Sequence, residues 1–251
     1  MMRHCFKVFL LLFAMPLFLW GGEGISYLVE FEGLDDAKTL KVIKSVAQLT
    51  ALKKAPPSLT ALRQRAEGDV PEILKILRAF GYYEAKVDFR IEENFPKARV
   101  LVYISTGPLY RIHSFVLNIS SPEDLSPDLY EKLELSSIGI HLGEPALSKT
   151  IIDSSNRVIA ILSENGFPFA KITNRQIIAD GKLHQLDIEL KISTGPIAFF
   201  GTTEITGATE TDVDWIRRKI TWHEGDLYDN RKLQVRLRKG YEEKELLSSL
   251  T

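Results

Sequence analysis

An internal repeat constrains the fold of this chain more than any other feature. The pentapeptide Ile-Ser-Thr-Gly-Pro at residues 104–108 recurs unchanged at residues 192–196, an offset of 88 residues. A second similarity links residues 81–87 (GYYEAKV) with residues 166–172 (GFPFAKI) at an offset of 85 residues. Two similarities at nearly the same offset are typical of tandem structural units. We therefore expect small domains in series, and 251 residues provide for two or three of them.

The first copy begins with a strand and a helix. Residues 25–34 mix β-branched, aromatic and acidic side chains, which favours a strand. Asp35 or Asp36 can cap a helix over residues 37–54, and the Pro-Pro pair that follows would end it. Ser58 can then cap a second helix.

A further helix and a hairpin complete the copy. Asp69 can cap a helix that tolerates Pro71 in its first turn. Residues 86–92 alternate apolar and charged side chains and predict a strand with one buried face. Residues 99–105 are more continuously apolar, which suits a central strand. The order of elements is β-α-α-β-β.

The second copy repeats this order. Its expected first strand covers residues 110–120, and its helices cover residues 127–135 and 147–162. Residues 170–179 and 183–193 form an expected hairpin around the Asp180-Gly181 turn signal. The aromatic residues of the repeated motif are expected to make core or helix–sheet contacts: Tyr82, Tyr83, Phe167 and Phe169.

A third copy begins but is expected to be incomplete. Residues 198–207 predict its first strand, and residues 212–220 and 229–247 its helices. A weaker similarity, between residues 141–144 (HLGE) and 223–226 (HEGD), supports this alignment. Residues after about Thr209 are expected to pack poorly, since the last two strands of the unit are not found before Thr251.

The N-terminus resembles a secretory signal peptide. Arg3 and Lys7 precede an apolar run over residues 8–20, and small residues follow, so we expect cleavage after Gly24. Thirteen apolar residues would form a helix of about 20 Å, shorter than a hydrocarbon core of about 30 Å. The expected domains are residues 1–24 (signal peptide), 25–108, 109–196 and 197–251.

Composition narrows the function classes. A net charge of −1 favours neither nucleic acid nor an anionic membrane as a partner. The only cysteine, Cys5, lies in the expected signal peptide, which leaves no disulfide or thiolate chemistry after cleavage. Phosphate-binding glycine loops and hydrolase or zinc-protease motifs do not occur. His141 and His223 occupy matching positions in separate units, which disfavours a shared metal site. We expect a non-enzymatic protein without cofactor or metal.

Several motifs resemble polypeptide-transport-associated (POTRA) domains of TamA-like proteins in the BamA/TamA superfamily. Residues 65–71 with 81–85 look like the first POTRA domain of that family. Residues 106–112 look like its first junction, and residues 225–228 like the motif between two helices of its third domain. The resemblance implies an α+β fold of tandem POTRA domains, each a three-stranded mixed sheet backed by helices, with the third repeat incomplete.

The resemblance also implies a location and a role. POTRA domains lie in the periplasm, associated with the outer membrane and in front of a β-barrel in the full-length form, and we expect this sequence to lack that barrel. They bind unfolded outer-membrane or secreted polypeptides, partly by adding a strand to a sheet edge, and TamA-like proteins work with a TamB-like inner-membrane-anchored partner. The family's strand order places the expected edge at Glu84, Lys86, Asp88, Arg90, Glu92, Lys171, Thr173 and Arg175.

Simpler interpretations stay open. The edges can be plain solvated surfaces that Lys86, Arg90 and Lys171 protect from aggregation. Gly107-Pro108 and Gly195-Pro196 are expected to fix the angle between domains as interdomain hinges. An alternative function is that of a POTRA-bearing cell-division protein of the FtsQ/DivIB kind on an uncleaved membrane anchor. Whether the chain is a stand-alone protein, one half of a split gene or a truncation is also open.

Overall fold

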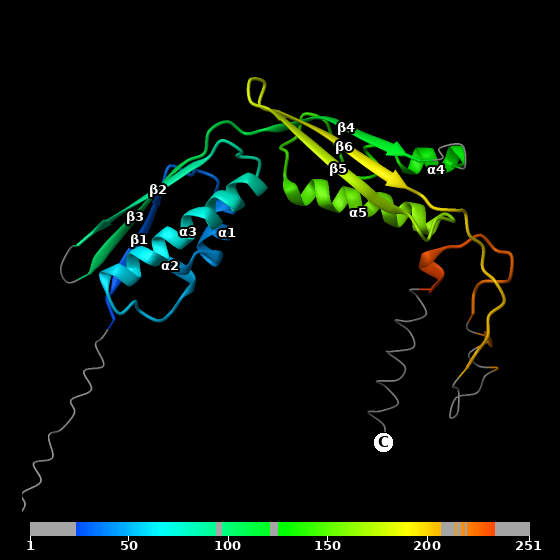
Figure 1. Cartoon of the computed structure of the whole chain (residues 1–251), viewed down its shortest axis with the longest axis horizontal. Helices are drawn as coiled ribbons and strands as arrows, with labels where there is room; N and C mark the ends of the chain where they lie inside the picture. Colours follow the sequence, from blue (N-terminus) through cyan, green and yellow to red (C-terminus); the bar gives the residue numbers. More distant parts are fainter. Residues whose placement is uncertain are drawn as a thin grey trace, which may run out of the picture.

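A computed structural model describes residues 24–93, 97–120, 125–206, 214, 217, 218 and 220–233. The expected signal peptide up to residue 23 and most of the two helices expected in the third repeat lie outside the described residues. The described chain forms two similar units in series, each with a three-stranded sheet and helices on one face (Figure 1).

The first unit has the predicted order of strands. Its central strand runs parallel to the first strand and antiparallel to the second, in the order β1-β3-β2. The elements are β1 (Tyr27–Glu32), α1 (Ala37–Val46), α2 (Gln48–Ala51), α3 (Leu59–Ala79), β2 (Lys86–Glu92) and β3 (Ala98–Ser105).

The second unit repeats this topology. Its sheet has the order β4-β6-β5, with β6 parallel to β4 and antiparallel to β5. The elements are β4 (Arg111–Ile119), α4 (Pro127–Lys132), α5 (Ser148–Glu164), β5 (Lys171–Asp180) and β6 (Gln185–Ser193). The two Ile-Ser-Thr-Gly-Pro segments begin at the ends of β3 and β6, so each follows the central strand of its own sheet, and the repeat is confirmed.

Each sheet packs one face on its helices to form a separate core. In β6, Leu186, Ile188 and Leu190 are almost completely buried, and the residues between them point to the other face. The central strand β3 is buried in the same alternating way through Val100, Val102 and Ile104. Period-two burial against amphipathic helices is the reason why these segments fold as sheets backed by helices.

The helices of the first unit differ from the prediction. The helix expected over residues 37–54 is interrupted at Ala47, whose ψ of 128° is extended. Asp69 does not begin a helix, because α3 runs continuously from Leu59 to Ala79 with Pro71 inside it. The buried Asp69 carboxylate instead accepts hydrogen bonds from the backbone N–H groups of Gln48 (2.7 Å) and Leu49 (2.9 Å). It thereby caps α2 from a neighbouring helix.

The third repeat begins as expected but without the expected strand. Over the described part of residues 198–207, only Phe199 pairs, in an isolated bridge with Leu227, and residues 200–206 form no strand. The backbone bonds nevertheless reproduce those of the second unit. Gly225 N–H donates to the Phe200 carbonyl as Gly143 N–H donates to that of Ile112, both at 2.7 Å, and the N–H groups of Phe200 and Ile112 donate back to the carbonyls of Asp226 and Glu144. Within the described residues, no helix is long and apolar enough to cross a bilayer.

Candidate sheet edges and the junction between units

The outer strands of both sheets are the candidate binding surfaces. Strands β2 and β5 lie at one edge of their sheets, as predicted, while β1 and β4 lie at the other. In the described chain, each outer strand pairs with its central strand alone, apart from short bridges. Backbone N–H and C=O groups along an outer edge can pair with a further extended chain.

The β2 edge has the predicted alternation. Lys86, Asp88 and Arg90 are exposed on the outer face of the sheet, and Glu92 is half-buried at the end of the strand. Val87, Phe89 and Ile91 alternate with them and pack against the core of the first unit. The alternation predicted from the sequence is therefore confirmed, although it does not show that this edge binds a partner.

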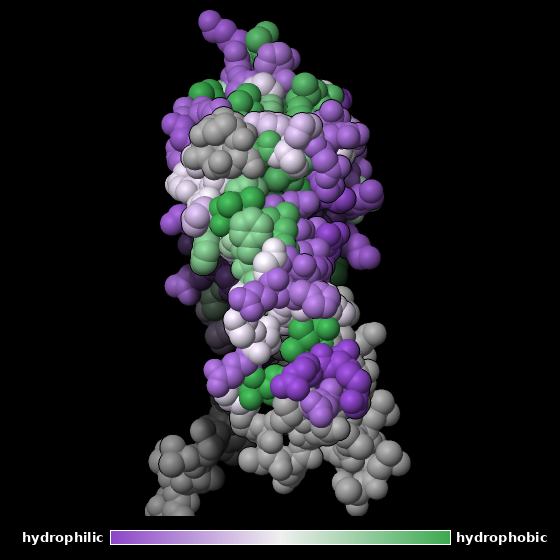
Figure 2. All heavy atoms as spheres, turned by 90° about the vertical axis from the view of Figure 1, so that its right-hand side faces the viewer, coloured by the Kyte–Doolittle hydropathy of each residue, from purple (hydrophilic) through white to green (hydrophobic). Residues whose placement is uncertain are grey.

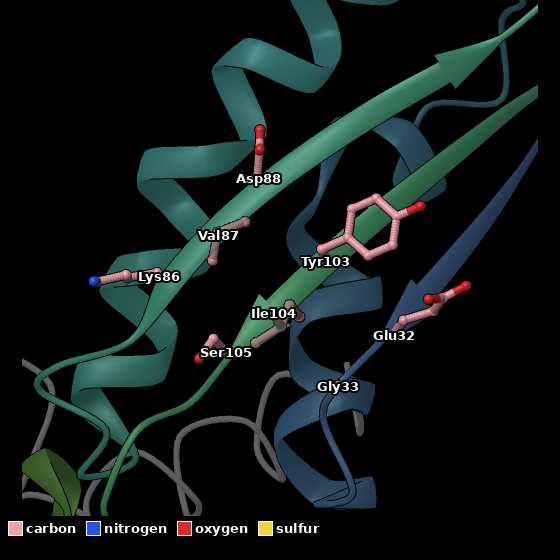
Figure 3. A pocket seen from close by; sticks show the side chains of 8 residues that line it. All are labelled: Glu32, Gly33, Lys86, Val87, Asp88, Tyr103, Ile104 and Ser105. Atoms are coloured by element: carbon pink, nitrogen blue, oxygen red, sulfur yellow. The ribbon is translucent and has the colours of Figure 1, made fainter.

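A shallow hollow of about 350 Å³ lies across the ends of the three strands of the first sheet. Figure 3 shows Tyr103 of β3 over the sheet, between Glu32 of β1 and Asp88 of β2, while Lys86 extends outward from the strand. Tyr103 is register partner to both carboxylate-bearing residues. The hollow thus combines an aromatic ring with flanking acidic groups, next to the open β2 edge.

The β5 edge differs from the expected one. The register shifts between Ile172 and Asn174, so Thr173 lies in a bulge and its hydroxyl donates to the Lys191 carbonyl at 3.1 Å. Lys171 lies beside Ser193 on the outer face, whereas Arg175 lies beside the buried Leu190 on the helix side. The bulge therefore separates these predicted edge residues onto different faces.

Glu84 is not an edge residue, because it precedes β2 and contacts the second unit. The Tyr110 hydroxyl donates a hydrogen bond of 2.7 Å to the Glu84 carboxylate. This bond, with burial and the nearby carboxylates of Glu84 and Asp180, raises the pKa of Tyr110 to about 12. The Tyr110 ring is 2% exposed and packs 5.2 Å from Tyr83 and 5.6 Å from His184, centroid to centroid. This cluster joins the two units.

The two hinge segments have matching conformations. Gly107 has a φ of 66° and Gly195 a φ of 67°, a region that residues with a Cβ rarely adopt. A Cβ at Gly107 would lie 3.2 Å from the Cβ of Glu84, and one at Gly195 would lie 2.9 Å from the Cβ of Phe169. Each glycine therefore packs against the segment before the hairpin of its own unit. The role of Pro108 and Pro196 in fixing the interdomain angle stays a prediction.

The aromatic prediction is correct for three residues and wrong for Phe169. Phe167 is buried in the second core, and Tyr82 packs on the first core. Tyr83 packs on the second core although it belongs to the first unit. Phe169 is 64% exposed, and it occupies the position that Glu84 has in the first unit, beside Gly195.

The start of the third repeat is joined to the second unit by the same backbone bond. Ala198 N–H donates to the Gly166 carbonyl at 2.8 Å, as Tyr110 N–H donates to that of Gly81 at 3.0 Å. Ile197, Phe199 and Leu227 are about half exposed there. Figure 2, which views this end of the molecule, shows hydrophobic groups between hydrophilic ones. Among the described residues, no cluster of three or more His, Cys, Asp or Glu side chains could hold a metal ion.

This β-α-α-β-β architecture, with a three-stranded mixed sheet and helices on one face, is that of the POTRA domain. The described chain has it twice in series, with the short α2 as an additional helical turn in the first unit. The chain is similar to POTRA domains 3–5 of BamA from Haemophilus influenzae. The identity is 20% and the TM-score 0.51, over 86% of this chain and 85% of that chain. This likeness supports the fold.

Other solved structures are more distant. The chain is similar to the N-terminal domain of Omp85 from Thermosynechococcus elongatus, with 14% identity and a TM-score of 0.37, over 87% of this chain and 85% of that chain. It is also similar to POTRA domains 1–3 of Omp85 from Anabaena, with 13% identity and a TM-score of 0.36, over 88% and 84%. No protein-family model and no curated protein matches the sequence.

Sequence reasoning missed the Glu84–Tyr110 contact and the β4 edge. The repeat offered a signal for the first, since Glu84 and Tyr110 are replaced by Phe169 and Ala198 in the next copy. A position that changes chemical character between copies is a candidate for a contact between units. The β4 edge gave no signal, because its helix-side residues look like ordinary core residues of a strand.

Proposed function

We propose that this chain is a non-enzymatic periplasmic scaffold in outer-membrane protein assembly, which binds extended polypeptides along its sheet edges. The observation that carries the proposal is the pair of POTRA units in series, each with an outer strand at both edges of its sheet. Strand addition depends on main-chain groups, so it suits a protein that handles many client sequences.

The finer parts of the proposal come from the sequence. The resemblance to TamA-like proteins favours unfolded outer-membrane polypeptides as clients and a TamB-like protein as partner. It also favours attachment to a β-barrel in the full-length form. The N-terminal signal-like segment supports export to the periplasm.

Site-specific photo-cross-linking tests the binding role. The full chain would carry a photoreactive residue at Asp88 on β2 or Gln176 on β5, with Arg63 on the exposed side of α3 as the matched control. The probe is a urea-unfolded outer-membrane protein diluted into buffer. We expect strong cross-links at both sheet positions and weak ones at Arg63. Equal yields at all three positions would contradict binding along the edges.

Mass spectrometry of the protein from cells separates the proposal from the cell-division alternative. Export with cleavage gives a new N-terminus near Ile25, whereas a protein on an uncleaved anchor retains Met1. The tandem arrangement of the units favours the assembly role. An intact N-terminus together with retention in the inner membrane would refute the proposed location.

A further inference from the structure

The edge of β4 is already used for strand pairing by the chain itself. The segment just before α5 lies antiparallel to the start of β4, with a bridge between Arg111 and Pro145. Gly143 N–H donates to the Ile112 carbonyl at 2.7 Å, and Ile112 N–H donates to the Glu144 carbonyl at 2.9 Å. Equivalent bonds, between Phe200 and residues 225–226, recur at the start of the third repeat.

The segment that pairs with the β4 edge does so only as far as Gly143, and the rest of the edge is exposed. Further along, Ser120 N–H donates to the Ile192 carbonyl of β6 at 2.9 Å. Main-chain groups alternate in direction along a strand, so those of Phe115, Leu117 and Ile119 point away from β6. Within the described residues, no strand pairs with this part of β4.

An apolar groove of about 550 Å³ runs beside these outward-facing groups. Figure 1 shows α4 close to the end of β4. The lining of the groove comes from β4 and from α4 with the turn that follows it: Phe115, Leu117, Ile119, Tyr130, Leu133, Glu134, Leu135 and Ser136. Glu134 is the one charged residue of this lining, and it is exposed.

We propose that the β4 edge and this groove bind an extended client segment as an added strand, with apolar side chains at alternate positions and a basic residue opposite Glu134. This inference rests on the proposed function and assigns the client to one edge. The exposed part of β4 continues an edge that already pairs with another segment of the chain, so a guest bound there adds as a further strand. The apolar lining selects side chains on one face of the guest, and the Glu134 carboxylate selects the basic one.

A designed peptide tests this assignment on the full chain. The probe is the octapeptide Ser-Val-Thr-Leu-Ser-Leu-Thr-Lys, which alternates polar and apolar residues and carries a lysine on the same face as the apolar side chains. Its control has the same sequence with methylated amide nitrogens at every second residue, so that it cannot donate along one edge. A benzoylphenylalanine at Tyr130 reports the groove, and one at Ile177 reports the β5 edge.

We expect cross-linking at Tyr130 at least tenfold above that at Ile177, and loss of it with the methylated peptide. Leu117→Lys should weaken binding about tenfold or more, whereas Val116→Lys, on the opposite face of the same strand, should leave binding unchanged. The methylated peptide needs no variant besides the two cross-linking ones, so it remains decisive if Leu117→Lys does not fold.

The other outcomes distinguish a failure of the β4 assignment from a failure of the proposed function. Cross-linking at Ile177 but not at Tyr130 would overturn the β4 assignment and leave strand addition at β5 as the proposed function. Equal binding of the methylated peptide would overturn strand addition at either edge. Cross-linking at neither position would overturn the β4 assignment, and the unfolded-protein test above would then decide the proposed function on its own.

Discussion

The buried Asp69 carboxylate gives the sharpest test of how the first unit is held together. Replacing Asp69 with alanine removes the acceptor of the Gln48 and Leu49 N–H groups without changing any surface charge pair. Leu49 N–H is buried, so its loss of a partner costs about 1–3 kcal/mol. The Gln48 N–H is partly accessible to water, and losing its cap costs about 1 kcal/mol.

Together these effects predict a destabilisation of the first unit by about 2–4 kcal/mol for Asp69→Ala. For a unit of this size, that corresponds to a fall in Tm of roughly 10–20 °C. Asp69→Asn retains one acceptor and should lose about half as much. Glu67→Ala, an exposed position on the same helix, serves as the matched control and should change stability by less than about 0.5 kcal/mol.

Hydrogen exchange measured by mass spectrometry is the suitable assay, because it reports the first unit separately from the second. The amides of Gln48 and Leu49 should exchange much faster in Asp69→Ala, and the amides of β3 should show the global loss of stability. If Asp69→Ala matches Glu67→Ala within error, the cap does not stabilise the unit, and the reasoning is wrong.

Three further predictions concern the junctions. The raised pKa of Tyr110 means that the folded state prefers the neutral phenol. The stabilisation by Tyr110 is therefore complete below pH 10 and is lost as the pH rises through about 12, which absorbance of tyrosinate and unfolding midpoints will show. Tyr110→Phe should remove about 1 kcal/mol of coupling and broaden spin-label distances between the units, and an unchanged distribution would refute a coupling role for the Tyr110–Glu84 hydrogen bond. Gly195→Ala should lose more stability than Gly143→Ala, by about 1 kcal/mol or more. Both positions have positive φ, but only Gly195 has a close neighbour, and equal losses in thermal unfolding would contradict the packing argument.

The sequence was sufficient to predict the repeat, the strands and their order in both described units. The repeat and the strands depend on local alternation or on similarity between copies, which a single chain displays directly, whereas the edge position of β2 and β5 came from the resemblance to the POTRA family. The interior of α3 was not predictable in this way. Asp69, Pro71 and Glu72 together form a typical helix start, and the true acceptor role of Asp69 depends on backbone about 20 residues away.

The continuity of α3 has an energetic reason. A proline inside a helix costs about 3 kcal/mol. Leu62, Ile73 and Leu77 lie on both sides of Pro71 and are almost fully buried in one core. Each such burial contributes about 1.5–3 kcal/mol, so a single helix is favoured over two shorter ones. Local sequence signals do not reveal this summed burial free energy, because it arises only in the assembled core.

The candidate edges show the same limit. The alternation in β2 could be predicted from the sequence. The bulge at Thr173 could not, because its neighbours Lys171, Asn174 and Arg175 fit either face of a strand. Phe169 looked like a core residue by analogy with its neighbours. It lies outside the core, before the hairpin and beside Gly195.

Both junctions rely on one main-chain hydrogen bond, from Tyr110 to Gly81 and from Ala198 to Gly166. A bond of this kind does not depend on the side chain of the donor, so a duplicated unit brings its own coupling with it. Arrays of this type can therefore lengthen or shorten during evolution by whole units. Substitutions at the Glu84 and Tyr110 positions remain free to adjust how stiffly each pair is joined.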